Sequence, residues 1–278
     1  MAAKILIEDG NPWWTSPNIW VVPGDDPNGS PGMPIAGQQN YLWARVENTG
    51  DTIINGAQIN FYWSNPATGV LRSNSTLIGF AFVDLEIGET KEVLCLTSWI
   101  PIIVNDGHEC VLAEVITTLD PLPVPLPDAF DPRNFDQIAQ RNLHVIQLNK
   151  LMINLMFFPI QISAPIRFDK EVVVRVDNTK LDKKQEREIL RSYGIKELPK
   201  FNDKLVEFGL SDSKDCGLSK KIIGNYEFMA SIKEGNSKAV YLHLRQNNKA
   251  KSGYQFINII ETVNGEIQGG NSFLIIKV

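Results

Sequence analysis

The sequence predicts an all-β protein with two β-sandwich domains in tandem, the second carrying a short helical insertion. Many short segments alternate apolar and polar residues with a period of two, and Gly, Pro and Asn turn signals separate them. Only one segment, 182–193, has the composition of a helix. The chain of 278 residues is long enough for two cores of ordinary size.

The two halves of the chain differ in composition, which supports two domains at 1–148 and 149–278. Residues 1–148 hold 6 Lys and Arg against 17 Asp and Glu, a net charge of −11, and they contain all six Trp. Residues 149–278 hold 21 Lys and Arg against 15 Asp and Glu, a net charge of +6. The simpler interpretation is two solvated surfaces; the sharper one is that the basic half meets an acidic partner.

The clearest element is the stretch 39–63, which reads as a hairpin made of a strand, a turn and a second strand. In its first arm Tyr41, Trp43 and Arg45 alternate with apolar residues, and the second arm ends at Trp63. The Asn-Thr-Gly sequence at 48–50 tolerates the backbone of a tight turn. Both arms carry an apolar face, which needs an opposing sheet to bury it.

The rest of the first half follows the same pattern of strands and turns. Surface loops are expected at 25–37 and 65–74, and the Pro-rich segment 120–133 reads as a strap crossing the end of the sandwich, because Pro cannot donate to a central strand. Further strands are expected at 5–7, 19–22, 77–82, 85–87, 91–99, 107–116 and, as the last strand of the domain, 144–148.

The second half repeats the first coarsely, with one insertion. The sequence EVVVRVDNT at 171–179 resembles YLWARVENT at 41–49. The predicted helix 182–193 has Asp182 at its N-cap and Gly194 at its C-cap. Strands are also expected at 204–210, 226–232, 240–244, 253–261 and 272–278.

Three stretches resemble bacterial immunoglobulin-like domains of the cell-adhesion-related, CARDB-like kind. They are VENTG at 46–50, GHECVLAEV at 107–115, and GYQFINIIE with the last hairpin at 253–270. The resemblance implies an immunoglobulin-like fold in which the Asn-x-Gly corner shapes a turn and has no catalytic role. The second half departs from it, because Lys180 replaces the Gly and the helix is inserted.

The sequence favours a protein that is not an enzyme and has no cofactor. His108, His144 and His243 fall on three separate predicted strands, and no GxSxG motif surrounds a Ser. Gly24, Gly29 and Gly32 lie among Pro residues and not between a strand and a helix, so they do not predict a phosphate-binding loop. Acidic residues interrupt the basic face of the predicted helix, which favours a solvated helix over a nucleic-acid contact.

No metal site is predicted with the required ligands. His108 and Cys110 are two ligands where zinc needs four. Asp25, Asp26, Asp128 and Asp131 are weak calcium candidates on loops, and turn chemistry accounts for the same residues.

The cysteines and the N-terminus leave the compartment open. Cys95, Cys110 and Cys216 include no CxxC; three reduced thiols are favoured, and a bridge between Cys95 and Cys110 is the alternative. Neither a cleavable signal peptide nor a membrane span is recognised, so we expect a cytoplasmic protein, one exported without a signal, or a fragment of a larger exported chain.

The residues proposed for binding are Trp13, Trp14, Trp20 and Arg141. Exposed, the indoles would form a platform for sugar or protein; buried, they would plug the sandwich. Arg141 either binds a ligand or ties the strap to the sandwich through backbone carbonyls. We therefore expect a non-enzymatic interaction or structural module that binds another protein, as part of a surface or exported assembly. The alternatives are a carbohydrate-binding module and an accessory domain of an enzyme on another chain.

Overall fold

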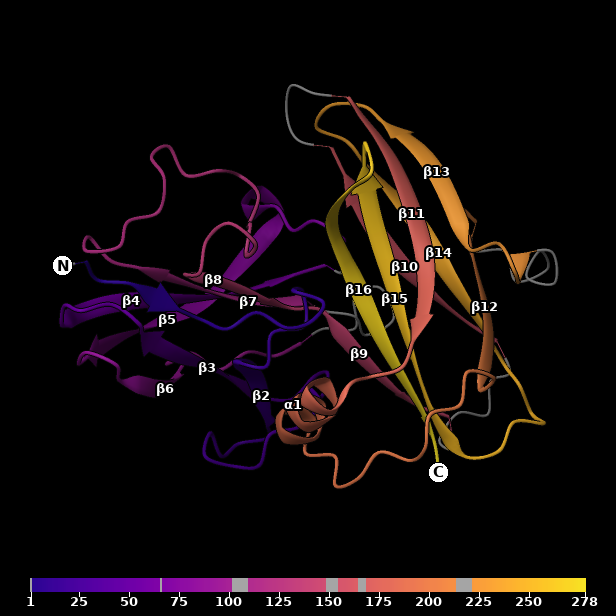
Figure 1. Cartoon of the computed structure of the whole chain (residues 1–278), viewed down its shortest axis with the longest axis horizontal. Helices are drawn as coiled ribbons and strands as arrows, with labels where there is room; N and C mark the ends of the chain where they lie inside the picture. Colours follow the sequence, from indigo (N-terminus) through magenta and orange to yellow (C-terminus); the bar gives the residue numbers. More distant parts are fainter. Residues whose placement is uncertain (1, 66, 102–109, 149–154, 165–168, 214–221) are drawn as a thin grey trace. The chain divides into compact units, whose positions relative to one another are not determined.

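A computed structural model (Figure 1) describes residues 2–65, 67–101, 110–148, 155–164, 169–213 and 222–278. It confirms the all-β fold: these residues form several sheets and one α-helix. The chain divides into two compact units. Unit 1 comprises Met1–Asn65, Val70–Asn142 and Lys184–Lys196, and unit 2 comprises Pro66–Gly69, Leu143–Lys183 and Glu197–Val278.

Unit 1 packs two antiparallel sheets around one core. The first sheet runs β1-β3-β2, with β6 also paired to β3, and the second runs β5-β4-β7-β8. The strands of the first sheet are β1 (Ile5–Leu6), β2 (Ile19–Pro23), β3 (Asn40–Asn48) and β6 (Thr90–Leu94). Those of the second are β4 (Ile54–Ser64), β5 (Ser75–Leu85), β7 (Cys110–Ile116) and β8 (Ile138–Arg141), and a 3-10 turn η1 (Arg72–Asn74) precedes β5.

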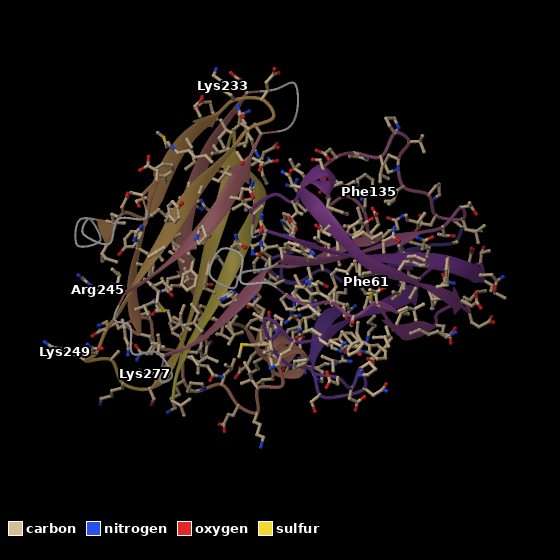
Figure 2. All side chains as sticks on the ribbon, turned by 180° about the vertical axis from the view of Figure 1, so that it is seen from behind. Phe61, Phe135, Lys233, Arg245, Lys249 and Lys277 are labelled. Atoms are coloured by element: carbon tan, nitrogen blue, oxygen red, sulfur yellow. The ribbon has the colours of Figure 1, made fainter. Side chains whose placement is uncertain are left out.

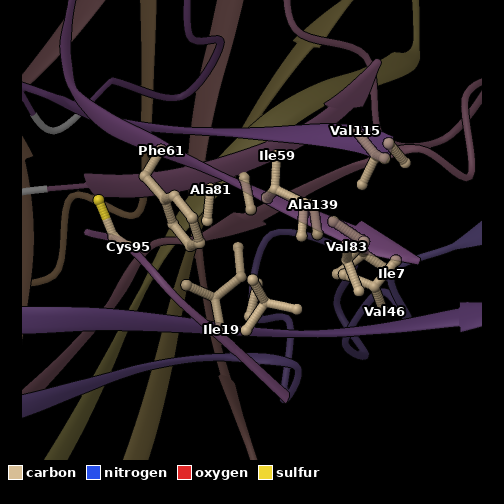
Figure 3. Close-up of a cluster of buried hydrophobic side chains, with 14 of the residues drawn as sticks. Ile7, Ile19, Val46, Ile59, Phe61, Ala81, Val83, Cys95, Val115 and Ala139 are labelled. Carbon is tan, nitrogen blue, oxygen red and sulfur yellow. The ribbon is translucent and has the colours of Figure 1, made fainter. Parts of the chain in front are cut away.

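The inward-facing side chains of both sheets form the core of unit 1 (Figure 3). Ile59 and Phe61 of β4 meet Ile19 of β2 and Val46 of β3, and all four are completely buried. Burying each such side chain contributes roughly 1.5–3 kcal/mol. The alternation read from the sequence therefore places the correct residues inside.

The two arms of the stretch 39–63 belong to different sheets, so the interpretation as a hairpin was wrong. β3 pairs with β1, β2 and β6, whereas β4 pairs with β5 and β7. Both arms still bury their apolar faces, because the two sheets face each other across one core. Alternation alone does not distinguish a hairpin from a corner that joins two sheets. Likewise, the two strands expected at 77–82 and 85–87 are one strand, β5.

The corner between β3 and β4 is held by the side chain of Asn48, which is completely buried. Its amide donates to the carbonyl oxygens of Thr52 at 2.9 Å and Glu86 at 3.1 Å, and its own oxygen accepts from the Gly50 N–H at 3.1 Å. A Cβ at Gly50 would lie 2.4 Å from the carbonyl oxygen of Ala2. The corner therefore requires both the amide and the glycine.

Unit 2 also packs two sheets around a core, ordered β10-β14-β12 and β13-β11-β15-β16-β9. β9 (Leu143–Gln147) pairs in parallel with β16, although the sequence suggested this segment as the last strand of the first domain. β10 includes residues 155–158 of the apolar run 151–158 and was not expected as a strand. The remaining strands are β10 (Leu155–Ser163), β11 (Lys170–Thr179), β12 (Val206–Ser211), β13 (Glu227–Ile232), β14 (Ser237–Gln246), β15 (Gly253–Val263) and β16 (Glu266–Lys277).

The helix α1 (Lys183–Tyr193) starts after Asp182 and stops before Gly194, whose φ is +60°. Its residues from Lys184 onward group with unit 1, where Arg191 lies 3.0 Å from Glu92. Within the described ranges no helix combines the length and apolar character needed to cross a membrane.

We expect Asn48→Asp to destabilise the protein by about 2–4 kcal/mol, because the substitution places a carboxylate against backbone carbonyls that now receive N–H groups. Urea unfolding measures the change. Asn178→Asp is the matched control, since Asn178 ends the similar segment in β11 but is exposed, and it should cost less than about 0.5 kcal/mol. Equal losses of unfolding free energy in the two variants would show that Asn48 at the corner stabilises the protein no more than the exposed Asn178 does.

Candidate protein-interaction surface

The outer face of the second sheet in unit 1 is only partly covered. The Pro-rich strap packs over β4 and β7 and forms a small second core with them. Phe135 belongs to this second core and Phe61 to the main core; both are labelled in Figure 2. The buried members of the second core are Val70, Cys110, Leu112, Phe130 and Ile138.

A buried ion pair fastens the strap to this face. Glu114 of β7 is 1% exposed, and its carboxylate lies 2.5 Å from the guanidinium of Arg72. That guanidinium also lies 4.1 Å from the ring centroid of Phe130 and donates through Nε to the carbonyl oxygen of Pro127 at 2.8 Å. One arginine therefore joins the sheet to both an aromatic side chain and the backbone of the strap.

Next to the strap, the outer face of β5 is exposed to solvent. Three side chains of β5 face the same side of the sheet as the outward residues of β4 with which they pair. They are Leu77, Phe80 and Phe82, which are 50%, 44% and 58% exposed. The rings of Phe80 and Phe82 contact each other edge to face at 5.7 Å. Among the described residues β5 pairs only with β4, so it is an edge strand with an apolar outer row.

A hollow of about 510 Å³ separates this row from the strap. The sheet lines it with Phe82 and Ile116, and the strap lines it with Val124 and Leu126. Val124 is 95% exposed. We call the set Leu77, Phe80, Phe82, Ile116, Val124 and Leu126 the open face.

The residues named from the sequence for binding lie elsewhere. Trp14 is 2% exposed and presents almost no ring surface, and the half-buried Trp13 packs edge-on against it at 5.3 Å. Trp20 stacks on Trp43 at 6.1 Å beside a separate groove. Arg141 is buried and donates to the carbonyl oxygens of Ser16 at 2.7 Å and Ile19 at 3.0 Å.

These bonds show that Arg141 does tie backbone carbonyls, but those of the N-terminal segment rather than those of the strap. The loop expected at 65–74 also differs from expectation: Ala67, Thr68 and Val70 are buried. The hydroxyl of Thr68 donates to the buried carboxylate of Glu261 within unit 2, so the first part of the segment is withdrawn from the surface, whereas Ser73 and Asn74 are exposed.

Three of the four candidate calcium ligands have carboxylates that accept hydrogen bonds. Asp128 accepts from the N–H and the hydroxyl of Ser73, both at 2.9 Å, and Asp26 accepts from the N–H of Asn28 at 2.9 Å. Asp131 accepts from the amide of Asn134 at 2.6 Å, and the backbone carbonyl of Asp25 lies 3.5 Å from the hydroxyl of Tyr41. In the part of the chain that the structure describes, no three His, Cys, Asp or Glu side chains gather as a metal site would require.

One histidine does approach a serine. His243 of β14 lies 2.9 Å through Nε2 from the hydroxyl of Ser211, and 3.1 Å from the carbonyl oxygen of Ser213. A carbonyl only accepts, so Nε2 carries the proton and cannot act as a base toward Ser211. Burial lowers the pKa of His243, and among the residues that the structure describes no hydrogen-bond partner reaches its Nδ1. The pair is therefore not a nucleophile and base.

His144, Cys95 and Cys110, which the structure describes, add no reactive group. His144 packs between Phe158 and Phe273, and burial lowers its pKa to about 4. Cys95 and Cys110 are free, buried thiols, and burial raises both pKa values. His108 and Cys216 lie outside the described residues.

No protein-family model matches the chain, and no curated protein matches it in sequence. Solved structures give distant likenesses. A CARDB domain from Pyrococcus furiosus, in complex with di-metal ions, is 14% identical over 50% of this chain and 85% of that chain, with a TM-score of 0.29. The CupB6 tip adhesin from Pseudomonas aeruginosa is 9% identical over 94% and 97%, with a TM-score of 0.28. A β-glucosidase from Kluyveromyces marxianus is 23% identical over 35% of this chain and 12% of that chain, with a TM-score of 0.21.

Sequence reasoning missed the open face, although the sequence holds a signal for it. The segment 80–83, Phe-Ala-Phe-Val, is apolar at every position, so a strand there has two apolar faces. One face fills the core, and the other needs its own cover. The strap supplies that cover only over β4 and β7.

Removing the arginine of the strap clamp should destabilise unit 1. We expect Arg72→Met to cost about 3–5 kcal/mol in urea unfolding, because it leaves the carboxylate of Glu114 buried without its partner. The double variant Arg72→Met with Glu114→Gln should recover part of this loss. Arg245→Met, which removes an exposed pair with Glu207, is the control and should cost less than about 1 kcal/mol. A small loss at Arg72 would show that the pair does not hold the strap.

Stability should fall as pH rises because of Asp9. Burial, with Asp136, Asp131 and Glu8 nearby, raises its pKa to about 8, far above the usual value of about 3.9 in an unfolded chain. The folded state therefore holds a proton that the unfolded state releases. This contribution is complete below about pH 4 and is lost as pH rises through 8.

Asp9→Asn should thus gain stability relative to wild type between pH 5 and 8. Because Asp9 is partly exposed, we expect about 1–2 kcal/mol rather than the full linkage value. Urea midpoints measured at several pH values test this. Parallel curves for the two proteins would contradict it.

Proposed function

We propose that this chain is a non-enzymatic protein-interaction module and that unit 1 binds its partner through the open face. The observation that carries the proposal is the row of exposed aromatic and aliphatic side chains on β5 beside the hollow at the strap. Soluble monomers rarely leave a contiguous apolar surface of this kind in water, and such surfaces mark interaction sites. Exposed Phe rings are also typical anchors of protein interfaces.

The position of the open face supports a protein partner more than a small ligand. The row lies on an edge strand, whose backbone groups can pair with a strand of another protein. The hollow next to it can take the side chain of an anchoring residue. The partner that fits best has a binding surface with an apolar centre and basic residues around it. The basic residues would complement the net charge of −11 on residues 1–148 and the carboxylate of Asp84, which continues the exposed row of β5.

A role in a surface or exported assembly, as expected from the sequence, is compatible with such an interface and belongs to this proposal. An accessory role beside an enzyme on another chain would use the same surface. Carbohydrate binding through the three N-terminal indoles alone is not supported, because Trp14 is 2% exposed, Trp20 is 9% exposed and Trp13 packs edge-on against Trp14.

The double variant Phe80→Ser with Phe82→Ser tests the proposal. Both side chains are exposed, so we expect stability close to wild type but loss of the proteins that the wild-type chain retains from an extract of its own organism. Retained proteins are identified by mass spectrometry, and stability is checked by thermal unfolding.

Met229→Ser is the matched control, because Met229 is 70% exposed on β13 of unit 2 and lies outside the open face. It should retain the same proteins as wild type. If the double variant retains them equally well, or if wild type retains none, the open face is not the binding surface.

A further inference from the structure

A second hollow in unit 1 lies over the first sheet and has a different chemistry. It holds about 290 Å³ and is formed by residues far apart in the sequence. Trp20 and Trp43 come from adjacent strands, Glu92 from β6 and Arg191 from α1. The loop at 25–37 supplies Pro27, Asn28, Gly29 and Pro31, and Pro17, Val22 and Ser192 complete the lining. We call it the indole groove.

Strand pairing builds the apolar wall of the groove. Trp20 and Trp43 are directly opposite each other on β2 and β3, and their rings stack with an interplanar angle of 7°. The indole N–H of Trp43 donates to the carbonyl oxygen of Pro27 at 3.0 Å, which fixes both the ring and the loop. The indoles are therefore held in place without a ligand.

Glu92 and Arg191 are the charged residues that line the groove, and Arg45, which does not line it, pairs with Glu92. The carboxylate of Glu92 is shared by the guanidinium groups of Arg45 and Arg191, the latter at 3.0 Å. Arg45 also lies 5.6 Å from the ring centroid of Trp20. Two positive charges thus meet one negative charge, and the Arg191 side chain is 59% exposed.

Arg45 and Glu92 belong to residues 1–148, whose net charge is −11, and Arg191 comes from residues 149–278, whose net charge is +6. Arg191 can donate to an incoming carboxylate while Arg45 continues to neutralise Glu92. The groove therefore favours an anionic ligand.

We propose that the indole groove binds one pyranose ring that carries a carboxylate, that is, a uronic acid residue of an acidic polysaccharide. Trp20 is 9% exposed, so the half-buried Trp43 and the prolines supply most of the apolar surface that would match the C–H face of a sugar ring. Asn28 and Glu92 offer partners for its hydroxyl groups, and Arg191 pairs with its carboxylate. This site is independent of the open face.

The size and polarity of the groove favour a sugar over a proline-rich peptide. A volume of about 290 Å³ suits one ring, whereas drug-sized ligands occupy about 300–1,000 Å³. A proline-rich peptide needs an extended aromatic groove and leaves charged groups such as Glu92 without hydroxyl partners.

The experiment is a titration of the whole chain with a galacturonate trisaccharide. The indole N–H resonance of Trp43, assigned with Trp43→Phe, reports binding in the groove, and calorimetry gives the affinity. We expect the Trp43 signal to shift and the neutral galactose trisaccharide to bind about tenfold more weakly, since one charged hydrogen bond is lost.

Arg191→Gln should weaken binding of the galacturonate trisaccharide about tenfold and remove its preference over the neutral sugar. Arg187→Gln, an exposed position on the same helix, should leave the affinity unchanged. Thermal unfolding confirms that both variants are folded. Acetate at equal concentration should not shift the Trp43 signal.

Four results would overturn the proposal. The first is that millimolar galacturonate trisaccharide does not shift the Trp43 signal, and the second is that Arg191→Gln and Arg187→Gln bind it with equal affinity. The third is that acetate binds as well as the trisaccharide, and the fourth is that the neutral sugar or a proline-rich peptide binds more strongly than the galacturonate trisaccharide.

Discussion

The buried ion pair between Glu114 and Arg72 determines how much of the outer sheet in unit 1 is exposed. A carboxylate that is 1% exposed on the outer face of β7 requires a positive partner, and Arg72 supplies it from the turn before β5. The same guanidinium holds Phe130 and the carbonyl of Pro127, so the strap must lie over β4 and β7. With the strap fixed there, it reaches only the hollow beside Phe82, and Phe80 and Phe82 stay 44% and 58% exposed. The open face is thus a consequence of where one charge is buried.

Much of the fold could be predicted from alternation, because a side chain that alternates along a strand must face either the core or the outside. Ile59 and Phe61 are buried as expected, and the helix lies within one residue of its expected limits. Pairing could not be predicted in the same way. The arms ending at Asn48 and beginning at Ile54 look like a hairpin, but the amide of Asn48 holds a corner between two sheets. The parallel partner of 143–147 lies more than a hundred residues away, and no local pattern identifies it.

The surfaces were harder to predict than the fold, since each depends on segments that the sequence separates. Trp20 was recognised as a candidate, but the groove it lines also needs Trp43, Glu92 and Arg191. Trp43 was assigned to a strand face without knowing that it would stand opposite Trp20. Conversely, the apolar run at 80–83 was visible, yet whether its second face is covered depends on the strap. Residue type predicts what a side chain can do, and topology decides which side chains meet.

The two surfaces lie on opposite sides of the same sandwich, because the inner faces of its two sheets share one core. The open face is apolar and sits at a sheet edge, which suits a large partner that excludes water. The indole groove is small and charged, which suits a ligand that keeps part of its hydration. A core of close-packed side chains separates them, so occupying one surface need not reshape the other. Under the two proposals, unit 1 would bind a protein on one sheet and a saccharide on the other.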